Sequence, residues 1–252
     1  MPSSLDRAPC DLCGSRRHLP LGYADVFRGS SVFDFLESRA GRLRVVTCRS
    51  CGFIFFSPRL TPAAMRALYA GPFYRMTRLT GAREKVYSRK KIAATAGRNP
   101  DFAPEMVRFL RPHFDFAETS ILEVRCKSGA FLLEAKKAGA GRLVGFDDFP
   151  PNVERCRYLG FEAAPFPIHD PPATPVTGTY DLIRLNNVLA HSASPTAALQ
   201  LFADHLRPGG LVFVEEPDIL AKERGPFPVV PFHYWHPTFN AIAALLAAKG
   251  FS

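Results

Sequence analysis

The stretch Ser120-Ile121-Leu122-Glu123-Val124-Arg125-Cys126-Lys127-Ser128-Gly129 decides the fold of this chain. It opens with an apolar run of strand length and ends where a helical pattern begins, which continues to Lys137. Downstream, strand-like and helix-like segments alternate, which is typical of a parallel α/β sheet. We therefore expect an α/β fold in which 120–124 is the first strand.

The segments that follow complete this pattern. Further strands are expected at 142–147, 180–185 and 211–215, and further helices at 152–159, 196–206 and 237–249, with a proline-rich loop at 165–175. In an open, doubly wound sheet, ligands bind at the carboxyl ends of the strands, near the point where the strand order reverses. This rule places 123–129, Asp147 and 186–191 around one crevice.

Two identical cysteine motifs lie in the N-terminal part of the chain. The pattern Cys-x-x-Cys-Gly occurs at 10–14 and again at 48–52, and the glycine lets the chain turn back behind each pair of sulfur atoms. Four thiolates with this spacing complete a closed tetrahedral zinc site of the structural type. The predicted ligands are Cys10, Cys13, Cys48 and Cys51.

Two disulfides or a redox-active pair are the alternatives to a zinc site. The segment before Cys10 is polar and contains no hydrophobic signal, so we expect a cytoplasmic, reducing location, where disulfides are rare. We therefore predict Zn²⁺. Cys126 and Cys156 are unpaired in the sequence, and we interpret them as small buried hydrophobic residues.

The composition limits the classes of protein. The 252-residue chain is 47% hydrophobic, which is enough for one large core and a small second domain. No apolar run reaches the roughly 18 residues of a membrane-spanning helix. The formal net charge of +9 fits an anionic partner, such as RNA, a phospholipid surface or a nucleotide-linked substrate. For the densest basic stretch, 75–98, we favour the alternative of a solvated helix face.

We expect three parts along the chain: a zinc-binding module at 1–60, a helical connector at 61–111 and a Rossmann-like, doubly wound α/β domain at 112–252. The connector begins with a short helix that has Thr61 as its N-cap and Pro62 at its first position. It continues as a basic helical pattern from 82 to 111, which is broken at Asn99-Pro100.

This order of segments resembles a class I S-adenosylmethionine-dependent methyltransferase, in particular the bacterial group that carries an N-terminal Cys₄ zinc module. The resemblance covers nearly the whole chain. Besides the cysteine motifs, it rests on Pro58-Arg59, Tyr69, Phe73-Tyr74, Ile121-Leu122-Glu123, Val144-Gly145-Phe146-Asp147, Asn187-Val188-Leu189-Ala190-His191 and Leu206-Arg207-Pro208-Gly209-Gly210. It implies methyl transfer from S-adenosylmethionine to a small, sugar-derived acceptor, such as a nucleotide-sugar or glycan.

The resemblance also implies roles for individual residues. The implied cofactor-binding residues are Glu123, Arg125, Lys127, Gly129, Asp147, Asp148 and Asn187. Asp147 is the better match for the residue that accepts the ribose hydroxyls, and for both aspartates the alternative is a solvated loop carboxylate. His191 and His233 are the candidates for removing a proton from the acceptor, with a structural role as the alternative for His191. Trp235 either faces the substrate or packs against the sheet.

The first loop departs from the family pattern acid-x-Gly-x-Gly-x-Gly, because Arg125 and Lys127 replace two glycines. Their side chains enter space that glycine leaves free. A nearby cation repels the positive sulfonium of the cofactor, whereas the cofactor carboxylate could pair with that cation. Further departures are Asn187 and Ala190, where the family commonly shows His and Glu.

Two other functions follow from these features. Arg125, Lys127 and Ala190 favour a catalytically inactive scaffold with the same fold. The basic stretch 75–98 and the zinc module would suit an RNA methyltransferase, although nucleic acid is not the partner that we favour. Related methyltransferases add a β-hairpin after the helix expected at 237–249, whereas this sequence stops at Ser252. Without a hairpin, strand 211–215 presents a hydrophobic edge, which a partner could cover.

Overall fold

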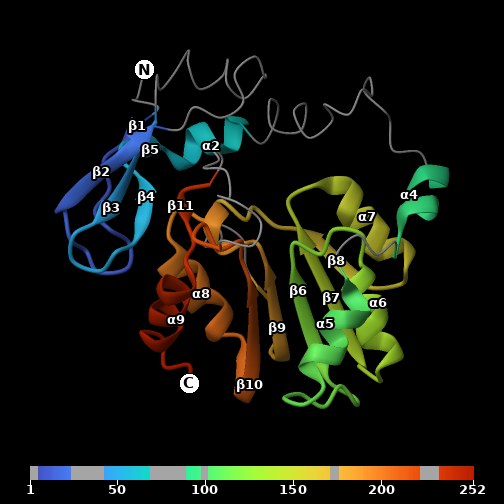
Figure 1. Ribbon diagram of the computed structural model, residues 1–252. Coiled ribbons are helices and arrows are strands. Elements are labelled where there is room, and N and C mark those ends of the chain that lie inside the picture. Colours follow the sequence, from blue (N-terminus) through green and yellow to red (C-terminus); the bar gives the residue numbers. More distant parts are fainter. Residues whose placement is uncertain (1–4, 24–42, 69–88, 98–101, 171–175, 222–232) are drawn as a thin grey trace. The chain divides into compact units, whose positions relative to one another are not determined.

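The computed structural model describes residues 5–23, 43–68, 89–97, 102–170, 176–221 and 233–252 (Figure 1). The chain forms two compact units. The first unit consists of Met1–Lys85, Leu189–Leu199 and Glu216–Ser252, and the second consists of Val86–Val188 and Gln200–Glu215. Among the described residues, no helix is long and apolar enough to cross a membrane.

The second unit is built on a five-stranded parallel sheet, whose strands lie side by side in Figure 1. Its strands are β6 (Ser120–Val124), β7 (Arg142–Asp147), β8 (Glu162–Pro165), β9 (Tyr180–Asn186) and β10 (Leu206–Glu215). Their order is β10-β9-β6-β7-β8. The chain therefore runs outward from β6 to β8 and then returns to β9 on the other side of β6, so the order reverses between β6 and β9. The predicted doubly wound parallel sheet is confirmed.

Strand β8 is one element that the sequence did not predict. It is short and only partly buried, and it pairs with β7 at the edge of the sheet. An edge strand of this kind is held mainly by backbone hydrogen bonds on one side, so its sequence needs no regular apolar alternation. The loop predicted at 165–175 therefore begins at the end of a strand, and residues 171–175 lie outside the described part.

Helices cover this sheet and share its core. They are α4 (Arg89–Thr95), α5 (Ala103–Leu110), α6 (Ala130–Lys137) and α7 (Pro150–Tyr158). One hydrophobic cluster joins α5, α6 and α7 to the strands, and its fully buried members include Ile121, Leu132, Ala135, Cys156 and Leu182. The basic pattern predicted from 82 to 111 is helical at α4 and α5, while residues 82–88 and 98–101 lie outside the described part.

Strand β10 forms the other edge of the sheet and pairs with β9. Its register shifts between Leu206 and Leu211, where a turn was predicted at Gly209-Gly210. Gly209 has a φ of 77°, which only glycine adopts without strain. Beyond that irregularity, the side chains from Leu211 to Glu215 are half-buried.

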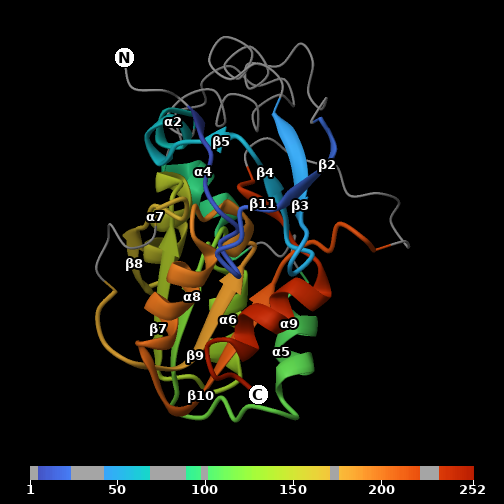
Figure 2. The same ribbon diagram turned by 90° about the vertical axis from the view of Figure 1, so that its left-hand side faces the viewer.

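The first unit contains a four-stranded antiparallel sheet, in which the strands lie next to one another (Figure 2). It consists, in order, of β11 (Trp235–His236), β4 (Ile54–Phe56), β3 (Arg44–Cys48) and β2 (His18–Tyr23). A second, two-stranded sheet pairs β1 (Leu5–Asp6) with β5 (Arg59–Leu60). Because β11 pairs with β4, a segment near residue 235 completes the sheet of the cysteine-containing region. The boundaries of the two compact units therefore differ from those of the three predicted parts.

Short helices complete the first unit: α2 (Pro62–Leu68), η3 (Leu189–His191) and α9 (Phe239–Ala247). Helix α8 (Pro195–Ala203) begins in the first unit and ends in the second. Thr61 caps α2 as predicted, since its Oγ1 accepts a hydrogen bond from the Ala64 amide at 3.2 Å. Helix α9 begins two residues later than predicted because Thr238 is its N-cap, accepting from the Ala241 amide at 3.1 Å.

Candidate functional site

The loop between β6 and α6 keeps the backbone shape of a glycine-rich loop with only one of its three glycines. Arg125, Lys127 and Gly129 have φ values of 66°, 51° and 78°, so all three positions where the family pattern has glycine are left-handed. Non-glycine residues adopt this conformation at a cost of roughly 1–2 kcal/mol each. The substitutions predicted to disturb the loop therefore leave its backbone turn in place and add strain to it.

At Gly129 both the left-handed backbone and the packing favour glycine. A Cβ atom at this position would lie 2.9 Å from Cδ1 of Leu159 and 3.2 Å from Sγ of Cys156. At Gly145 in β7, a Cβ would lie 2.9 Å from Sγ of Cys126. The loop can thus pack closely against α7 because these two residues have no Cβ atom. At Arg125 and Lys127 the fold requires only a left-handed backbone conformation.

Cys126 and Cys156 fill the space behind the loop. Both are fully buried, and their sulfur atoms lie 3.2 Å apart. The contact with Cys156, together with burial, raises the pKa of the Cys126 thiol well above its usual range. This environment agrees with their predicted role as small buried residues.

Asp147, at the end of β7, organises the loop. One of its carboxylate oxygens accepts a hydrogen bond from the Lys127 amide and the other from the Phe149 amide, both at 2.9 Å. The side chain is 1% exposed, and burial raises its pKa despite these bonds. Asp148 is partly exposed, and burial together with the charge of Asp147 raises its pKa to about 7. Of the two predicted ribose acceptors, Asp148 is therefore the more accessible.

Arg125 reaches across the point where the strand order reverses. Its guanidinium donates a hydrogen bond to the backbone carbonyl of Asn187 at 2.9 Å. Asn187 directly follows β9 and is itself left-handed, with a φ of 53°. Two residues predicted from separate motifs thus meet at the carboxyl ends of neighbouring strands, β6 and β9.

Glu123 lies within a buried ionic group that the sequence analysis did not identify. The guanidinium of Arg184 donates to Glu123 on one side and to Glu215 on the other, and it lies over the ring of Phe131. Glu123 and Arg184 are 1% and 2% exposed. Burial raises the pKa of Glu123 to about 8, against the lowering effect of Arg184. In the sequence, the signal for this ionic group was a single cationic residue, Arg184, within the largely apolar strand Tyr180–Asn186.

The four predicted metal ligands converge in the first unit. The sulfur atoms of Cys10, Cys13, Cys48 and Cys51 all lie within 4.8 Å of one another. Sγ of Cys10 is 3.5 Å from that of Cys51, and Sγ of Cys13 is 3.6 Å from that of Cys48. Zinc–sulfur bonds near 2.3 Å place the corners of a regular tetrahedron about 3.8 Å apart. The cluster is therefore of the right size for one tetrahedral ion, and no sulfur pair is within disulfide-bond length.

The two cysteine motifs have the same backbone geometry. In each, the glycine amide donates to the carbonyl of the first cysteine: Gly14 to Cys10 at 2.8 Å and Gly52 to Cys48 at 2.9 Å. Both glycines are left-handed, with φ values of 72° and 75°. Burial raises the pKa of Cys48, but amide hydrogen bonds, including one from Ser50, outweigh it and lower this pKa to about 7. These bonds favour a thiolate at Cys48, whereas burial raises the pKa of Cys10 and of Cys51.

Three buried histidines lie together elsewhere in the first unit. The rings of His191 and His233 are 4.5 Å apart, and those of His233 and His236 are 6.2 Å apart. Burial lowers the pKa of His236 to about 4, so its imidazole is neutral at physiological pH. The structure therefore brings the two predicted catalytic histidines into contact. His236, which was not among the candidate catalytic residues, lies next to His233.

Trp235 packs in the interior of the first unit. It is 1% exposed, its ring stacks on Phe53 at 4.6 Å, and its indole N–H donates to the Leu189 carbonyl at 2.5 Å. The packing interpretation of this residue is thus the one that the structure supports.

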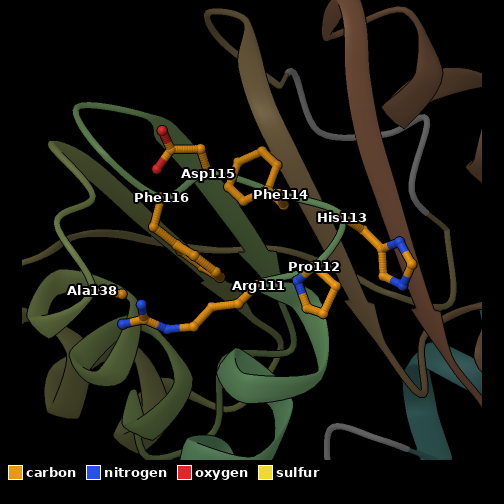
Figure 3. A pocket seen from close by; sticks show the side chains of 7 residues that line it. All are labelled: Arg111, Pro112, His113, Phe114, Asp115, Phe116 and Ala138. Carbon is orange, nitrogen blue, oxygen red and sulfur yellow. The ribbon is translucent and has the colours of Figure 1, made fainter.

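A shallow pocket of about 370 Å³ lies elsewhere in the second unit (Figure 3). Its lining is the turn from Arg111 to Phe116 together with Ala138. This turn precedes β6, so the pocket is near the amino end of that strand. The predicted cofactor residues follow the carboxyl ends of the strands, and the pocket is therefore separate from them.

Comparison with known proteins identifies related families. A family model described as "Methyltransferase domain" matches residues 89–252. The chain is 32% identical over 91 residues to the ribosomal protein L11 methyltransferase of Dechloromonas aromatica (strain RCB), which covers 36% of this chain and 30% of that protein. It is 27% identical over 146 residues to the tRNA U34 carboxymethyltransferase of Syntrophotalea carbinolica, and this match covers 52% of this chain and 44% of that protein. The chain thus spans less than half the length of these two relatives.

A solved structure shares the fold. The S-adenosylmethionine-dependent methyltransferase from Mesorhizobium loti superposes with a TM-score of 0.50 at 16% identity, covering 60% of this chain and 82% of that one. At this level of identity the likeness concerns the fold of the chain.

Proposed function

Since this chain belongs to the methyltransferase-domain family, we propose that it transfers a methyl group from S-adenosylmethionine to a small, sugar-derived acceptor. The observation that carries the proposal is the loop after β6. It keeps three left-handed positions, at Arg125, Lys127 and Gly129, and Asp147 holds it in place through the Lys127 amide. The acceptor class rests on the resemblance of the sequence motifs.

The described residues fit the cofactor. Partly exposed Asp148 is the carboxylate that we assign to the ribose hydroxyls, while buried Asp147 shapes the loop. Arg125 and Lys127 occupy two of the glycine positions of the loop, where a cation repels the positive sulfonium of the cofactor. We also assign Glu123, Gly129 and Asn187 to the cofactor-binding residues. When bound, S-adenosylmethionine supplies an electrophilic methyl group.

Side chains of the protein carry out the other steps of the reaction. An acceptor hydroxyl or amine loses a proton as it is methylated, and a neutral imidazole can take up that proton. We assign this role to His191 or His233. Apart from proton removal, catalysis of this kind consists mainly of holding the acceptor in position.

We further propose that Cys10, Cys13, Cys48 and Cys51 hold one Zn²⁺ ion. All four positions of a tetrahedral ion are then taken by protein sulfur, so the ion has a structural role and no site for substrate. The convergence of the four sulfur atoms within 4.8 Å supports this assignment.

Calorimetric titration with S-adenosylhomocysteine tests the proposal. We expect one molecule bound per chain and weaker binding by Asp148→Asn, with Asp115→Asn, before the amino end of β6, as a control that leaves binding unchanged. Absence of binding by the wild-type protein would support the inactive scaffold instead.

An RNA acceptor is the second candidate, because the name of one curated relative refers to a transfer RNA. Most of the basic stretch 75–98 lies outside the described residues. If this stretch binds RNA, then changing Arg89, Lys90 and Lys91 together to alanine should reduce the salt slope of log K by about 2.7, which corresponds to three lost phosphate contacts. We expect weak RNA binding and no such change.

A further inference from the structure

The segment Leu189–Leu199 belongs to the first unit, although the chain reaches it directly from β9 of the second unit. It contains η3, with His191, and the start of α8. Its hydrogen bonds with Asp11, Tyr234 and Trp235 lie within the first unit. They connect each end of the segment to one of the two cysteine motifs.

Asp11, between Cys10 and Cys13, holds the end of the segment. Its Oδ2 accepts a hydrogen bond from the Thr196 amide at 2.9 Å and another from the Thr196 hydroxyl at 2.7 Å, across 185 residues of sequence. Ser194 accepts from the Ala197 amide at 3.2 Å. The first turn of α8 therefore has two of its free amides satisfied, one by a local side chain and one by the cysteine motif. A carboxylate is also favoured at this end of a helix.

Phe53, which directly follows the second motif, supports the start of the segment. Its ring stacks on Trp235 with an interplanar angle of 18°, and the Trp235 indole N–H donates to the Leu189 carbonyl. Next to it, the Tyr234 amide donates to the Ala190 carbonyl at 2.8 Å. His191, the following residue, is thus preceded by two anchored carbonyls.

We propose that the Cys₄ centre is a scaffold for Leu189–Leu199, and that Asp11 is the positioning residue through which metal binding holds the start of α8. The proposal rests on the zinc part of the proposed function. Asp11 lies between two ligands, so its place depends on the turn that the metal closes. Without the ion, the two motifs lose their common centre and the support at Thr196 is lost with it.

Hydrogen–deuterium exchange of the full chain tests this proposal, with bound zinc measured in the same samples. In the wild type, removing zinc with a chelator should speed exchange across 189–199. Asp11→Ala should retain one equivalent of zinc and exchange about fivefold faster at Thr196 and Ala197, as expected for a lost helix cap. In this variant, zinc removal should have no further effect on those two amides.

Matched variants separate this role from general loss of stability. Asp218→Ala removes another carboxylate of the first unit, which accepts from the Leu220 and Phe239 amides, and should leave 189–199 unchanged. Asp11→Asn retains an acceptor and should restore most of the protection. If Asp11→Ala does not fold, Thr196→Val removes the hydroxyl partner and should show a smaller acceleration that also depends on zinc.

The outcomes distinguish a failure of the scaffold proposal from a failure of zinc binding itself. One equivalent of zinc in the wild type, with exchange in 189–199 that is the same with and without metal, would overturn the scaffold while leaving zinc binding intact. Less than half an equivalent in freshly purified protein would overturn both.

Discussion

Arg125 donates a hydrogen bond to the carbonyl of Asn187 at 2.9 Å, and both residues have left-handed backbone conformations. This contact joins the loops after β6 and β9, between which the order of the sheet reverses. That point is where open α/β sheets bind their ligands. A ligand that binds at the Asn187 carbonyl therefore meets the Arg125 guanidinium there and competes with it for space.

Replacing Arg125 tests this competition. Both Arg125→Gly and Arg125→Ala remove the guanidinium, so both should bind S-adenosylmethionine more tightly than the wild type in calorimetry, and adding Lys127→Gly should strengthen binding further. Only glycine relieves the left-handed strain, so Arg125→Gly should be more stable to urea than Arg125→Ala by about 1 kcal/mol. Weaker cofactor binding in both variants would mean instead that Arg125 is a productive ligand for the cofactor carboxylate.

Arg184 is expected to be essential for the stability of the second unit. Arg184→Met leaves the carboxylates of Glu123 and Glu215 without their shared cation, and we expect a loss of about 3–5 kcal/mol in the free energy of unfolding. The double variant Glu123→Gln with Arg184→Met should recover part of this loss, because it removes the buried carboxyl group that has lost its partner. Urea denaturation of both variants gives the comparison, and equal stabilities would contradict it.

Burial of His236 should make the stability of the protein depend on pH. Burial holds its pKa near 4, whereas the unfolded chain takes up this proton near pH 6.5. The unfolded state therefore binds more protons between these values, and stability should fall as the pH is lowered from 6.5 to 4, by up to about 3 kcal/mol. His236→Phe should flatten this dependence in urea denaturation. The exposed His113→Phe serves as the control, and a slope that persists in His236→Phe would assign the effect to other groups.

Cys48→Ser should abolish zinc binding. One ligand fewer leaves the site open and weakens the metal-dependent fold of the first unit. The α/β sheet of the second unit should remain folded, since its core cluster consists of residues from that unit. Metal analysis and circular dichroism of the purified variant check the two expectations. A full equivalent of zinc in Cys48→Ser would show that Cys48 is not a ligand.

Local sequence patterns determined most of the second unit. The apolar runs that became β6, β7 and β9, and the helical spacing that became α6, are set within windows of a few residues, so they could be predicted without knowing the rest of the chain. The two cysteine motifs were equally clear, because spacing alone places two sulfur atoms on one side of an ion. The doubly wound, parallel arrangement of the sheet also followed from the alternation of strands and helices.

The tertiary structure decided what depends on residues far apart in the sequence. The backbone at Arg125 and Lys127 keeps a glycine-like turn because Asp147, on the next strand, holds the Lys127 amide. The pairing of β11 with β4 and the bond from Asp11 to Thr196 likewise join segments that no local pattern connects. Such contacts form only when the whole chain has folded, because their free energy comes from partners that a sequence window does not contain. For this protein, composition and periodicity therefore define the sheet and the cysteine centre, whereas the roles of Asp11, Arg184 and Arg125 follow from the folded chain.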